Sequence, residues 1–523
     1  MGNLRLTDIA IIIAYLLIMV GVGFYFSRKN KTASQFTKAS GKIPGWALGL
    51  SIYATFLSSN TFLGVPGKAF ASNWNAFMFS LSMPFAAWFA SKYFVRYYRE
   101  HGAISAYTNL EQRFGLWART YAVVCFLLTQ LARMGSVFFG IAISLQALTH
   151  FPMSTIMIVT GICIIIYTVL GGIEAVIWTE VVQGVIKTIG AIIILYLVIS
   201  NLPHGVKDVV SVGTTDNKFS LGSYKLNFTE SSFWVVLLYG FFINLNNFGM
   251  DQNYVQRYHA ASSDKSASKS IWLCVYIYVP ASLLFFFIGT SLYAYYQLHP
   301  QMLSEITSSV ALEKITSGAA HGSVNQVAQS LTPADYGDKI MPHFMVKEVP
   351  TGVLGLIISS ILSAAMSTIS SSMNSTATIF VEDIYKRYYN NKITDAKSMR
   401  LLYIATVVFG LLGMSTGLAM IGVKSVLDIW WELSGIFAGG MLGLFLLGMI
   451  SKSTKNTEAI TATIIGICII IWMTFPSLIP DRLEFLRSPF HKNMIIVVGT
   501  LSIFLSGVLI TQFRQRSYKK QAA

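Results

Sequence analysis

The stretch that decides the fold runs from Ser51 to Gly67 and reads Ser-Ile-Tyr-Ala-Thr-Phe-Leu-Ser-Ser-Asn-Thr-Phe-Leu-Gly-Val-Pro-Gly. A run of polar residues, Ser58 to Thr61, interrupts an apolar segment of membrane-spanning length, and Gly64 and Pro66 follow it. Unwound backbone inside a bilayer is tolerated only where it lines a cavity or binds something. The pattern therefore predicts a membrane helix broken near the bilayer centre. The alternative is a serine-rich contact between two continuous helices.

The composition agrees with a chain that crosses a membrane many times. Of its 523 residues, 54% are hydrophobic and 12% are charged, whereas soluble domains carry about 25% charged residues. The net charge of +15 would indicate nucleic-acid binding in a soluble chain. Here the basic residues fall in short loops, where membrane orientation accounts for them better. We therefore expect an all-α polytopic membrane protein with no nucleic-acid partner.

Thirteen apolar stretches are long enough to span a bilayer, at about 20 residues each. They are Ile9–Phe26, Ile43–Pro66, Trp74–Val95, Tyr121–Leu148, Ser154–Leu170, Val176–Ile199, Phe233–Met250, Ile271–Tyr296, Val349–Ile379, Leu401–Ile421, Ile429–Ile450, Ala459–Phe475 and Met494–Phe513. Basic residues gather in alternate loops and in the C-terminal tail. The positive-inside rule then places the N-terminus outside and the C-terminus in the cytoplasm, which requires an odd number of spans.

Signatures of enzymes and of metal or disulfide sites are missing from the sequence. The four cysteines lie far apart in apolar runs and form no CxxC pair. No Walker-type, HExxH or GxSxG motif occurs. We therefore expect no enzymatic activity, no nucleotide-driven pump and no organic cofactor.

The seventh apolar stretch contains a second group of polar residues. Asn244, Asn246 and Asn247 lie between Gly240 and Gly249 in an otherwise apolar segment. An amide in hydrocarbon is costly unless it is paired. This pattern predicts a second interrupted helix, five spans after the first. Two interrupted helices in corresponding positions indicate a transporter built from inverted halves.

The ninth apolar stretch carries a row of hydroxyl groups. Ala364, Ser367, Thr368 and Ser371 stand at positions i, i+3, i+4 and i+7 and so share one helical face. Uncharged oxygens in such a row suit a hard cation bound with modest affinity. The alternative is that each hydroxyl bonds the carbonyl group four residues back.

Three ionisable residues fall within or at the ends of spans. Arg133 lies in the fourth span, where its partner could be a substrate carboxylate or an internal one. Glu180 lies at the inner end of the sixth span, where an ordinary solvated carboxylate is the simpler reading. Lys187, seven residues on, could extend to the interface or pair with Glu180.

These residues resemble the sodium:solute symporter family over essentially the whole chain. The signatures that carry the resemblance are Gly-Gly-Ile-Glu-Ala-Val-Ile-Trp-Thr-Glu-Val-Val-Gln from Gly171, Asn-Ser-Thr-Ala-Thr-Ile-Phe from Asn374 with Glu382-Asp-Ile-Tyr after it, and Met-Asp-Gln-Asn-Tyr-Val-Gln-Arg from Met250. The resemblance implies a LeuT-type inverted-repeat fold with 13 transmembrane helices. One lead helix would precede ten core helices, and two C-terminal helices would follow them.

This fold implies a division of the chain into five parts. They are the lead helix and first cytoplasmic loop (1–42), the first inverted repeat (43–200), an external loop (201–230), the second inverted repeat (231–450) and two C-terminal helices with a basic tail (451–523). The second repeat includes a long external connection (297–347), in which we expect short interfacial helices rather than a separate domain.

The resemblance also implies where sodium binds. The main site would use the carbonyl oxygens of Ala54, Leu57 and Ala364 with the side chains of Ser367 and Thr368. Some members similar to sialic acid carriers have a second site, which would fall on Glu180, Ser367, Ser370 and Ser371. The family usually has Asp where this chain has Glu180. We expect one or two sodium ions, with two favoured.

The solute implied by the resemblance is acidic. Sugar carriers of the family tend to have Glu-Gln or similar residues at the positions of Asn60 and Thr61, and these are absent. Arg133 with the Ala54–Gly67 stretch resembles the sialic acid carriers, whose solute is N-acetylneuraminate. The expected solute-binding residues are Phe56, Ser58, Ser59, Asn60, Thr61, Arg133, Asn244 and Asn247. The alternative is a sodium-coupled carrier of a neutral sugar or an amino acid. We expect a monomer in a bacterial cell membrane.

Overall fold

A computed structural model gives the arrangement of the chain. It describes residues 5–27, 32–39, 41–149, 151–423, 425–476, 479 and 481–522. Within these ranges every regular element is a helix, and the one β-type pairing is an isolated bridge between Ile43 and Ala261. The expected all-α fold is confirmed.

Ten helices of the described chain are long and apolar enough to cross a membrane. They are α1 (Leu6–Ser27), α9 (Leu116–Thr149), the second part of α10 (Met153–Ser200), α12 (Phe233–Met250), α14 (Asp264–Leu298), α18 (Val353–Ile379) continued by η4 (Phe380–Tyr389), α19 (Asp395–Ala419), α20 (Val426–Ile450), α21 (Asn456–Thr474) and α22 (Met494–Ala522). A bent pair formed by α3 (Gly45–Phe56) with η1 (Asn60–Gly64) and α4 (Val65–Ala71) gives an eleventh crossing.

Two further expected spans are present as shorter helices. The first part of α10, Met153–Val169, is apolar but shorter than the others. The stretch expected as the third span is a series of short helices, η2 (Trp74–Phe77), α5 (Met78–Leu81), α6 (Met83–Phe89), η3 (Ala90–Phe94) and α7 (Val95–His101). The number thirteen therefore stays a prediction.

Gly172 separates the two parts of α10. Its backbone has φ 57° and ψ −173°, a conformation that residues with a Cβ rarely adopt. The break falls between the expected fifth and sixth spans, so these two expected spans meet at Gly172 inside α10.

The first predicted helix break is present at the predicted place. α3 ends at Phe56, Leu57 and Ser58 leave the helical path, and the chain resumes in η1 at an angle of 59°. A π-helical turn often marks a functional site in a membrane helix. The polar run Ser58–Thr61 thus lies at the bend.

The second break is not where the amides predicted it. α12 runs without interruption through Asn244 and Asn247 to Met250. The chain breaks at Asp251, which has extended backbone angles, and α13 (Gln252–Ala260) follows. Asn244 is instead used between helices, since its Nδ2 donates to Phe79 O and Ser82 Oγ, both at 3.2 Å.

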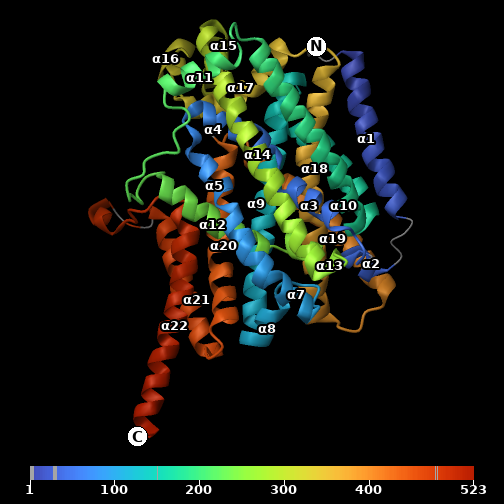
Figure 1. Cartoon of the computed structure of the whole chain (residues 1–523), viewed down its shortest axis with the longest axis vertical. Coiled ribbons are helices and arrows are strands. Elements are labelled where there is room, and N and C mark those ends of the chain that lie inside the picture. Colours follow the sequence, from blue (N-terminus) through green and yellow to red (C-terminus); the bar gives the residue numbers. More distant parts are fainter. Residues whose placement is uncertain are drawn as a thin grey trace.

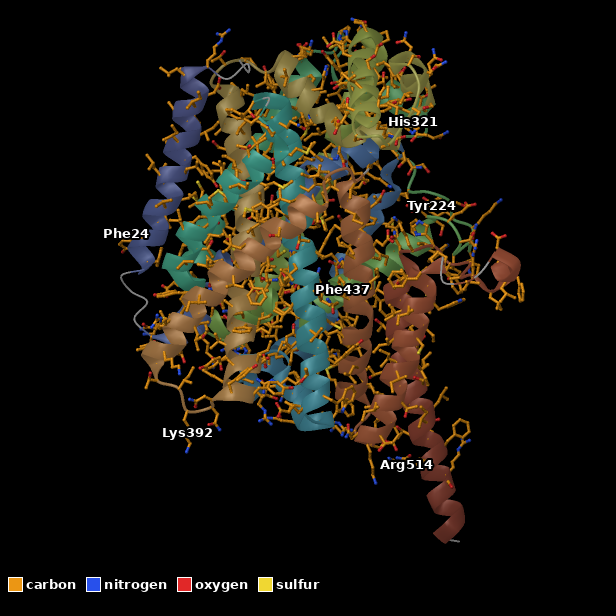
Figure 2. The ribbon with its side chains drawn as sticks, turned by 180° about the vertical axis from the view of Figure 1, so that it is seen from behind. Phe24, Tyr224, His321, Lys392, Phe437 and Arg514 are labelled. Atoms are coloured by element: carbon orange, nitrogen blue, oxygen red, sulfur yellow. The ribbon has the colours of Figure 1, made fainter. Side chains whose placement is uncertain are left out.

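The long connection at residues 297–347 holds helices, as predicted. These are α15 (Pro300–Thr316), α16 (Val324–Ser330) and α17 (Pro333–Glu348), and an earlier connection holds α11 (Val206–Thr215). Figure 1 shows these four helices together at the end of the molecule where α1 begins, whereas α22 runs to the opposite end. We call these four helices, α11, α15, α16 and α17, the helical cap. In Figure 2, Lys392 and Arg514 lie toward the opposite end and His321 lies in the helical cap.

Burial separates the core helices from those that face outward. α18 is buried along almost its whole length, including every residue from Ile357 to Ile379. α1 exposes large apolar side chains such as Leu17 and Phe24, and Phe24 points outward in Figure 2. The hydroxyl row of α18 therefore meets protein. α3, α10 and α18 lie beside one another in the interior (Figure 1).

Candidate solute and cation sites

A cavity lies against the first helix break. It encloses about 720 Å³ of space between atoms, open solvent at its mouth included. Its walls come from the broken helix and from η2, α5, α9, α12, α14 and α20. The lining residues are Phe56, Ser58, Asn60, Thr61, Val65, Ala76, Phe79, Ser80, Arg133, Tyr239, Ile243, Asn247, Tyr278, Ser282, Phe286, Leu427, Trp430 and Trp431.

The structure brings six of the eight expected solute-binding residues together around this cavity. They are Phe56, Ser58, Asn60, Thr61, Arg133 and Asn247. Ser59 does not line it, because its hydroxyl donates to Val137 O at 3.0 Å in the contact with α9. Asn244 is held by Phe79 of α5 and by Ser82, which lies between α5 and α6. These two residues therefore lie beside the cavity.

Apart from Phe56, sequence reasoning missed the aromatic part of the wall. Trp431 stacks on Phe79 with ring centroids 5.6 Å apart, and Tyr239 lies 5.1 Å from Trp431. The chain has 35 Phe, 25 Tyr and 10 Trp residues, so an aromatic residue in a span carries little positional information. Only the packing of α5, α12 and α20 shows which of them face the cavity.

Arg133 joins the two helix breaks. Its Nη2 donates to Thr55 O at 2.9 Å, at the end of α3, and to Tyr254 OH at 3.1 Å. Its Nη1 lies 3.4 Å from Asp251 Oδ2, at the second break. The guanidinium also lies over the Trp430 ring, 5.8 Å from the centroid. Of the two partners left open by the sequence, an internal carboxylate is therefore present, while Arg133 still lines the cavity.

Asp251 is the carboxylate that sequence reasoning left without a role. Its Oδ1 accepts from the backbone N–H of Asn253 at 2.8 Å, which caps the start of α13. Its Oδ2 accepts from Gln130 Nε2 at 3.2 Å. A carboxylate directly after an apolar span was the available signal, because such a group needs a partner.

The residues expected at the main sodium site come together, but around a lysine. Lys187 Nζ donates to Ala54 O at 2.6 Å, to Leu57 O at 2.7 Å and to Ser367 Oγ at 3.0 Å. Lys187 is completely buried. It therefore neither extends to the interface nor forms an ion pair with Glu180. Thr368 Oγ1 donates to Ala364 O at 3.3 Å, the bond to the carbonyl four residues back.

Two of the four residues expected at the second sodium site, Glu180 and Ser371, contact an arginine. Glu180 is completely buried, so the reading as a solvated carboxylate is wrong. Its Oε2 accepts from Arg257 Nη2 at 2.6 Å, and the same Nη2 donates to Ser371 Oγ at 2.7 Å. Ser370 lies apart from this group, since its hydroxyl donates to Ser367 O at 3.3 Å. Glu180 and Ser371 are thus brought together by Arg257.

Comparison with known families decides the membership of the chain. The model of the family described as "Sodium:solute symporter family" matches residues 36–466. The chain belongs to this family. The resemblance drawn from the sequence is confirmed, and so is the LeuT-type fold that it implied.

Similar proteins and a similar structure have been described. The symporter is 32% identical to a sodium/sialic acid symporter of Aliivibrio fischeri, over 95% of this chain and 91% of that protein. It is 28% identical to a sodium/sialic acid symporter of Proteus mirabilis, over 94% of each chain. A solved structure of a Na⁺-coupled sialic acid symporter, substrate-bound and outward-open, has a TM-score of 0.84 and 27% identity, and covers 97% of this chain and 98% of that one.

Proposed function

We propose that this symporter imports an acidic sugar, N-acetylneuraminate, driven by the sodium gradient. The observation that carries the proposal is Arg133, a buried cation that lines the cavity next to the first helix break. Relatives named as sodium/sialic acid symporters support the choice of solute. An arginine holds a carboxylate through two parallel hydrogen bonds, which gives orientation as well as energy.

The ion pair of Arg133 leaves room for a solute carboxylate. At 3.4 Å the distance to Asp251 Oδ2 is longer than the 2.7–2.9 Å typical of charge-assisted hydrogen bonds. Asp251 has three further hydrogen bonds, from Gln130 and from both nitrogens of Asn253. It can therefore stay satisfied while the guanidinium turns part of its donor set toward a solute.

The remaining cavity wall suits a polyhydroxylated ring. Ser58, Thr61 and Asn247 offer hydroxyl and amide groups, and Asn60 Oδ1 is buried without a hydrogen-bond partner among the described residues. A buried acceptor of this kind favours a solute that donates to it. The rings of Phe79, Tyr239 and Trp431 offer apolar surface for the carbon face of a sugar.

Transport would follow alternating access. Net movement needs a free energy of coupling between the sodium and solute sites, and no covalent bond is made or broken. The two inverted repeats would rock about the solute held near the bilayer centre. Sodium entering from outside favours the solute-binding state, and release of both occurs on the cytoplasmic side.

The proposal includes the placement of the protein in its membrane. We place it in the cell membrane of a bacterium as a monomer, with the N-terminus outside and the C-terminus in the cytoplasm. Lys392 and Arg514 lie toward one end of the molecule, opposite the helical cap (Figure 2). This agrees with the positive-inside rule if the cap faces outward.

One observation favours the second candidate, a neutral sugar or an amino acid. Arg133 already faces the Asp251 carboxylate, so its charge is balanced before any solute binds. A neutral solute would then need only the hydroxyl and amide groups of the cavity. The two candidates differ in whether the solute must bring a negative charge.

Competition for uptake separates these candidates. Purified protein in proteoliposomes with an inward sodium gradient should accumulate radiolabelled N-acetylneuraminate, and an equal potassium gradient should not support uptake. Unlabelled N-acetylneuraminate should compete, whereas its methyl ester, galactose and proline should compete at least about tenfold less well. Equal competition by the methyl ester, which lacks the carboxylate charge, would show that Arg133 does not anchor the solute by charge.

A further inference from the structure

Lys187 occupies the centre of an oxygen cage made by the first helix break and α18. The cage, defined as Ala54 O, Leu57 O, Ala364 O, Ser367 Oγ and Thr368 Oγ1, is the expected main sodium site. The ammonium group has three N–H donors, and each finds an acceptor in this cage, at 2.6, 2.7 and 3.0 Å. An ammonium has no further donor to offer.

The packing of α10 directs Lys187 into this cage. Gly190 lets α10 approach α18 closely, since a Cβ there would lie 2.2 Å from Ser360 Oγ. On the other side, Gly184 lies against Tyr53 and Ala54 of α3. Lys187, between these two glycines, therefore extends its side chain between α3 and α18, and it is completely buried.

The charges of the interior leave Lys187 without a carboxylate partner. Arg257 is paired with Glu180, and Arg133 faces Asp251. Among the described residues no carboxylate lies within ion-pair distance of Lys187 Nζ. Its hydrogen-bond acceptors are all neutral oxygens, the kind of ligand that a bound alkali cation would have. A sodium ion bound to Ala54 O, Leu57 O and Ser367 Oγ would have to share these oxygens with a second positive charge.

We propose that the Lys187 ammonium is a built-in cation that occupies the main cation position of this symporter in place of a transported sodium. It fastens the first helix break to α18 in every cycle. The position therefore takes up no sodium, so the sodium coupled to transport binds outside this cage. The proposal rests on the proposed sodium coupling and is independent of which solute is carried.

Equilibrium binding of ²²Na⁺ to the purified protein, without solute, tests this directly. Lys187→Ala empties the cage while leaving all five oxygens, so it should bind one sodium per protein more than the wild type. Adding Thr368→Ala removes one cage oxygen, and the extra sodium should then bind at least about tenfold more weakly. Lys392→Ala, which changes an exposed lysine, serves as the matched control and should leave sodium binding unchanged.

The wild-type background gives a second test that needs no change at Lys187. Thr368 Oγ1 receives no hydrogen bond from Lys187 but belongs to the expected sodium ligands. Thr368→Ala alone should change sodium affinity by less than about twofold. A tenfold loss in this variant, or a Lys187→Ala protein that elutes as a folded monomer and binds no extra sodium, would overturn the proposal. Failure of the solute assignment would instead appear as absent N-acetylneuraminate uptake with these sodium counts intact.

Discussion

At the two helix breaks of this symporter, side chains of opposite charge bind the backbone groups that have lost their helical hydrogen bonds. At the first break, between α3 and η1, the freed groups are carbonyl oxygens, and two side-chain cations bind them. Lys187 binds Ala54 O and Leu57 O, and Arg133 binds Thr55 O. At the second break, between α12 and α13, a carboxylate replaces the missing helical bonds. Asp251 caps α13 and accepts hydrogen bonds from its neighbours.

This difference explains why the two breaks are joined. A break that exposes carbonyl groups attracts cations, and a break capped by a carboxylate attracts the same cations. Arg133 contacts both, through Thr55 O and Asp251. Arg257, which follows the second break on α13, contacts Ser51 and Thr55 of the first broken helix and pairs with Glu180. Cationic side chains thus link the first broken helix to Asp251 and α13 at the second break.

The largest expected effect comes from removing the cation that joins both breaks. Arg133→Ala leaves Asp251 buried without its charged partner and removes the proposed solute anchor. Losing the buried ion pair between Arg133 and the solute carboxylate costs roughly 3–5 kcal/mol of binding free energy. Affinity for N-acetylneuraminate should therefore fall at least about a hundredfold, at 1.4 kcal/mol per tenfold. Arg133→Lys should restore only part of it, because an ammonium lacks the planar fork. Equilibrium binding of the labelled solute measures this.

The matched control is Arg96→Ala, which changes an exposed arginine paired with Glu100 on the same helix. It should leave solute affinity within about twofold of the wild type, as expected for a surface pair. If correctly folded Arg133→Ala protein bound the solute normally, Arg133 would be a structural link between the breaks and no more.

The second prediction removes the carboxylate that holds Arg257 to the first broken helix. Glu180→Gln keeps the shape but leaves the Arg257 guanidinium buried without a counter-charge, at a cost of roughly 3–5 kcal/mol of stability. The melting temperature in detergent without sodium should fall clearly below that of Glu100→Gln, which changes an exposed pair. Equal melting temperatures for the two variants would contradict the role given to this pair.

The third prediction concerns the outer half of the first broken helix. α4 packs on α17, where Asp338 Oδ2 accepts from the N–H of Val426 at 2.9 Å. Burial raises the pKa of Asp338 from 3.8 to about 6. Between pH 4 and 6 the folded chain therefore keeps the Asp338 proton, whereas the unfolded chain has released it. The stability that comes from holding this proton is lost as the pH rises through 6.

Asp338→Asn removes this titration. The variant should gain stability over the wild type above pH 6, by at most about 3 kcal/mol, and should match it near pH 4. Melting temperatures of both proteins across this range give the comparison. A difference between them that did not change with pH would exclude the buried carboxyl as its cause.

The smallest expected effect separates the two roles of Asp251. Both Asp251→Asn and Asp251→Ala remove the charge that faces Arg133, but asparagine can still cap α13. The alanine variant should be less stable than the asparagine variant by about 1 kcal/mol, measured by thermal unfolding. Identical stability would mean that the cap contributes nothing at the second break.

The sequence predicted the first break but misplaced the second, for a physical reason. Four polar residues in an apolar run, followed by Gly64 and Pro66, rarely form one unbroken membrane helix. The amides of α12 looked similar, yet Asn244 reaches across to Phe79 O and Ser82 Oγ and so needs no break. Whether an amide marks a helix break or bonds to a neighbouring helix depends on the packing of that neighbour. A single sequence does not show this packing.

The cation positions show the same limit. The hydroxyl face of α18 and the carbonyl groups of the first break were predicted from spacing and resemblance, and the structure brings them together. Lys187 was visible in the sequence, but its direction depends on how closely α10 approaches α3 and α18 at Gly184 and Gly190. The aromatic cavity wall, including Trp430 and Trp431, likewise follows from the packing of α20 against α5 and α12.

The most direct test of the central claim, sodium-driven transport of an acidic sugar, is the balance point of the wild-type protein in proteoliposomes. N-acetylneuraminate is placed on both sides at zero membrane potential, and the solute gradient at which net flux vanishes is measured at several sodium gradients. The account predicts that a tenfold larger sodium gradient moves this balance point by at least about tenfold, because each coupled sodium contributes its own free energy. A balance point that stays at equal solute concentrations, whatever the sodium gradient, would contradict it.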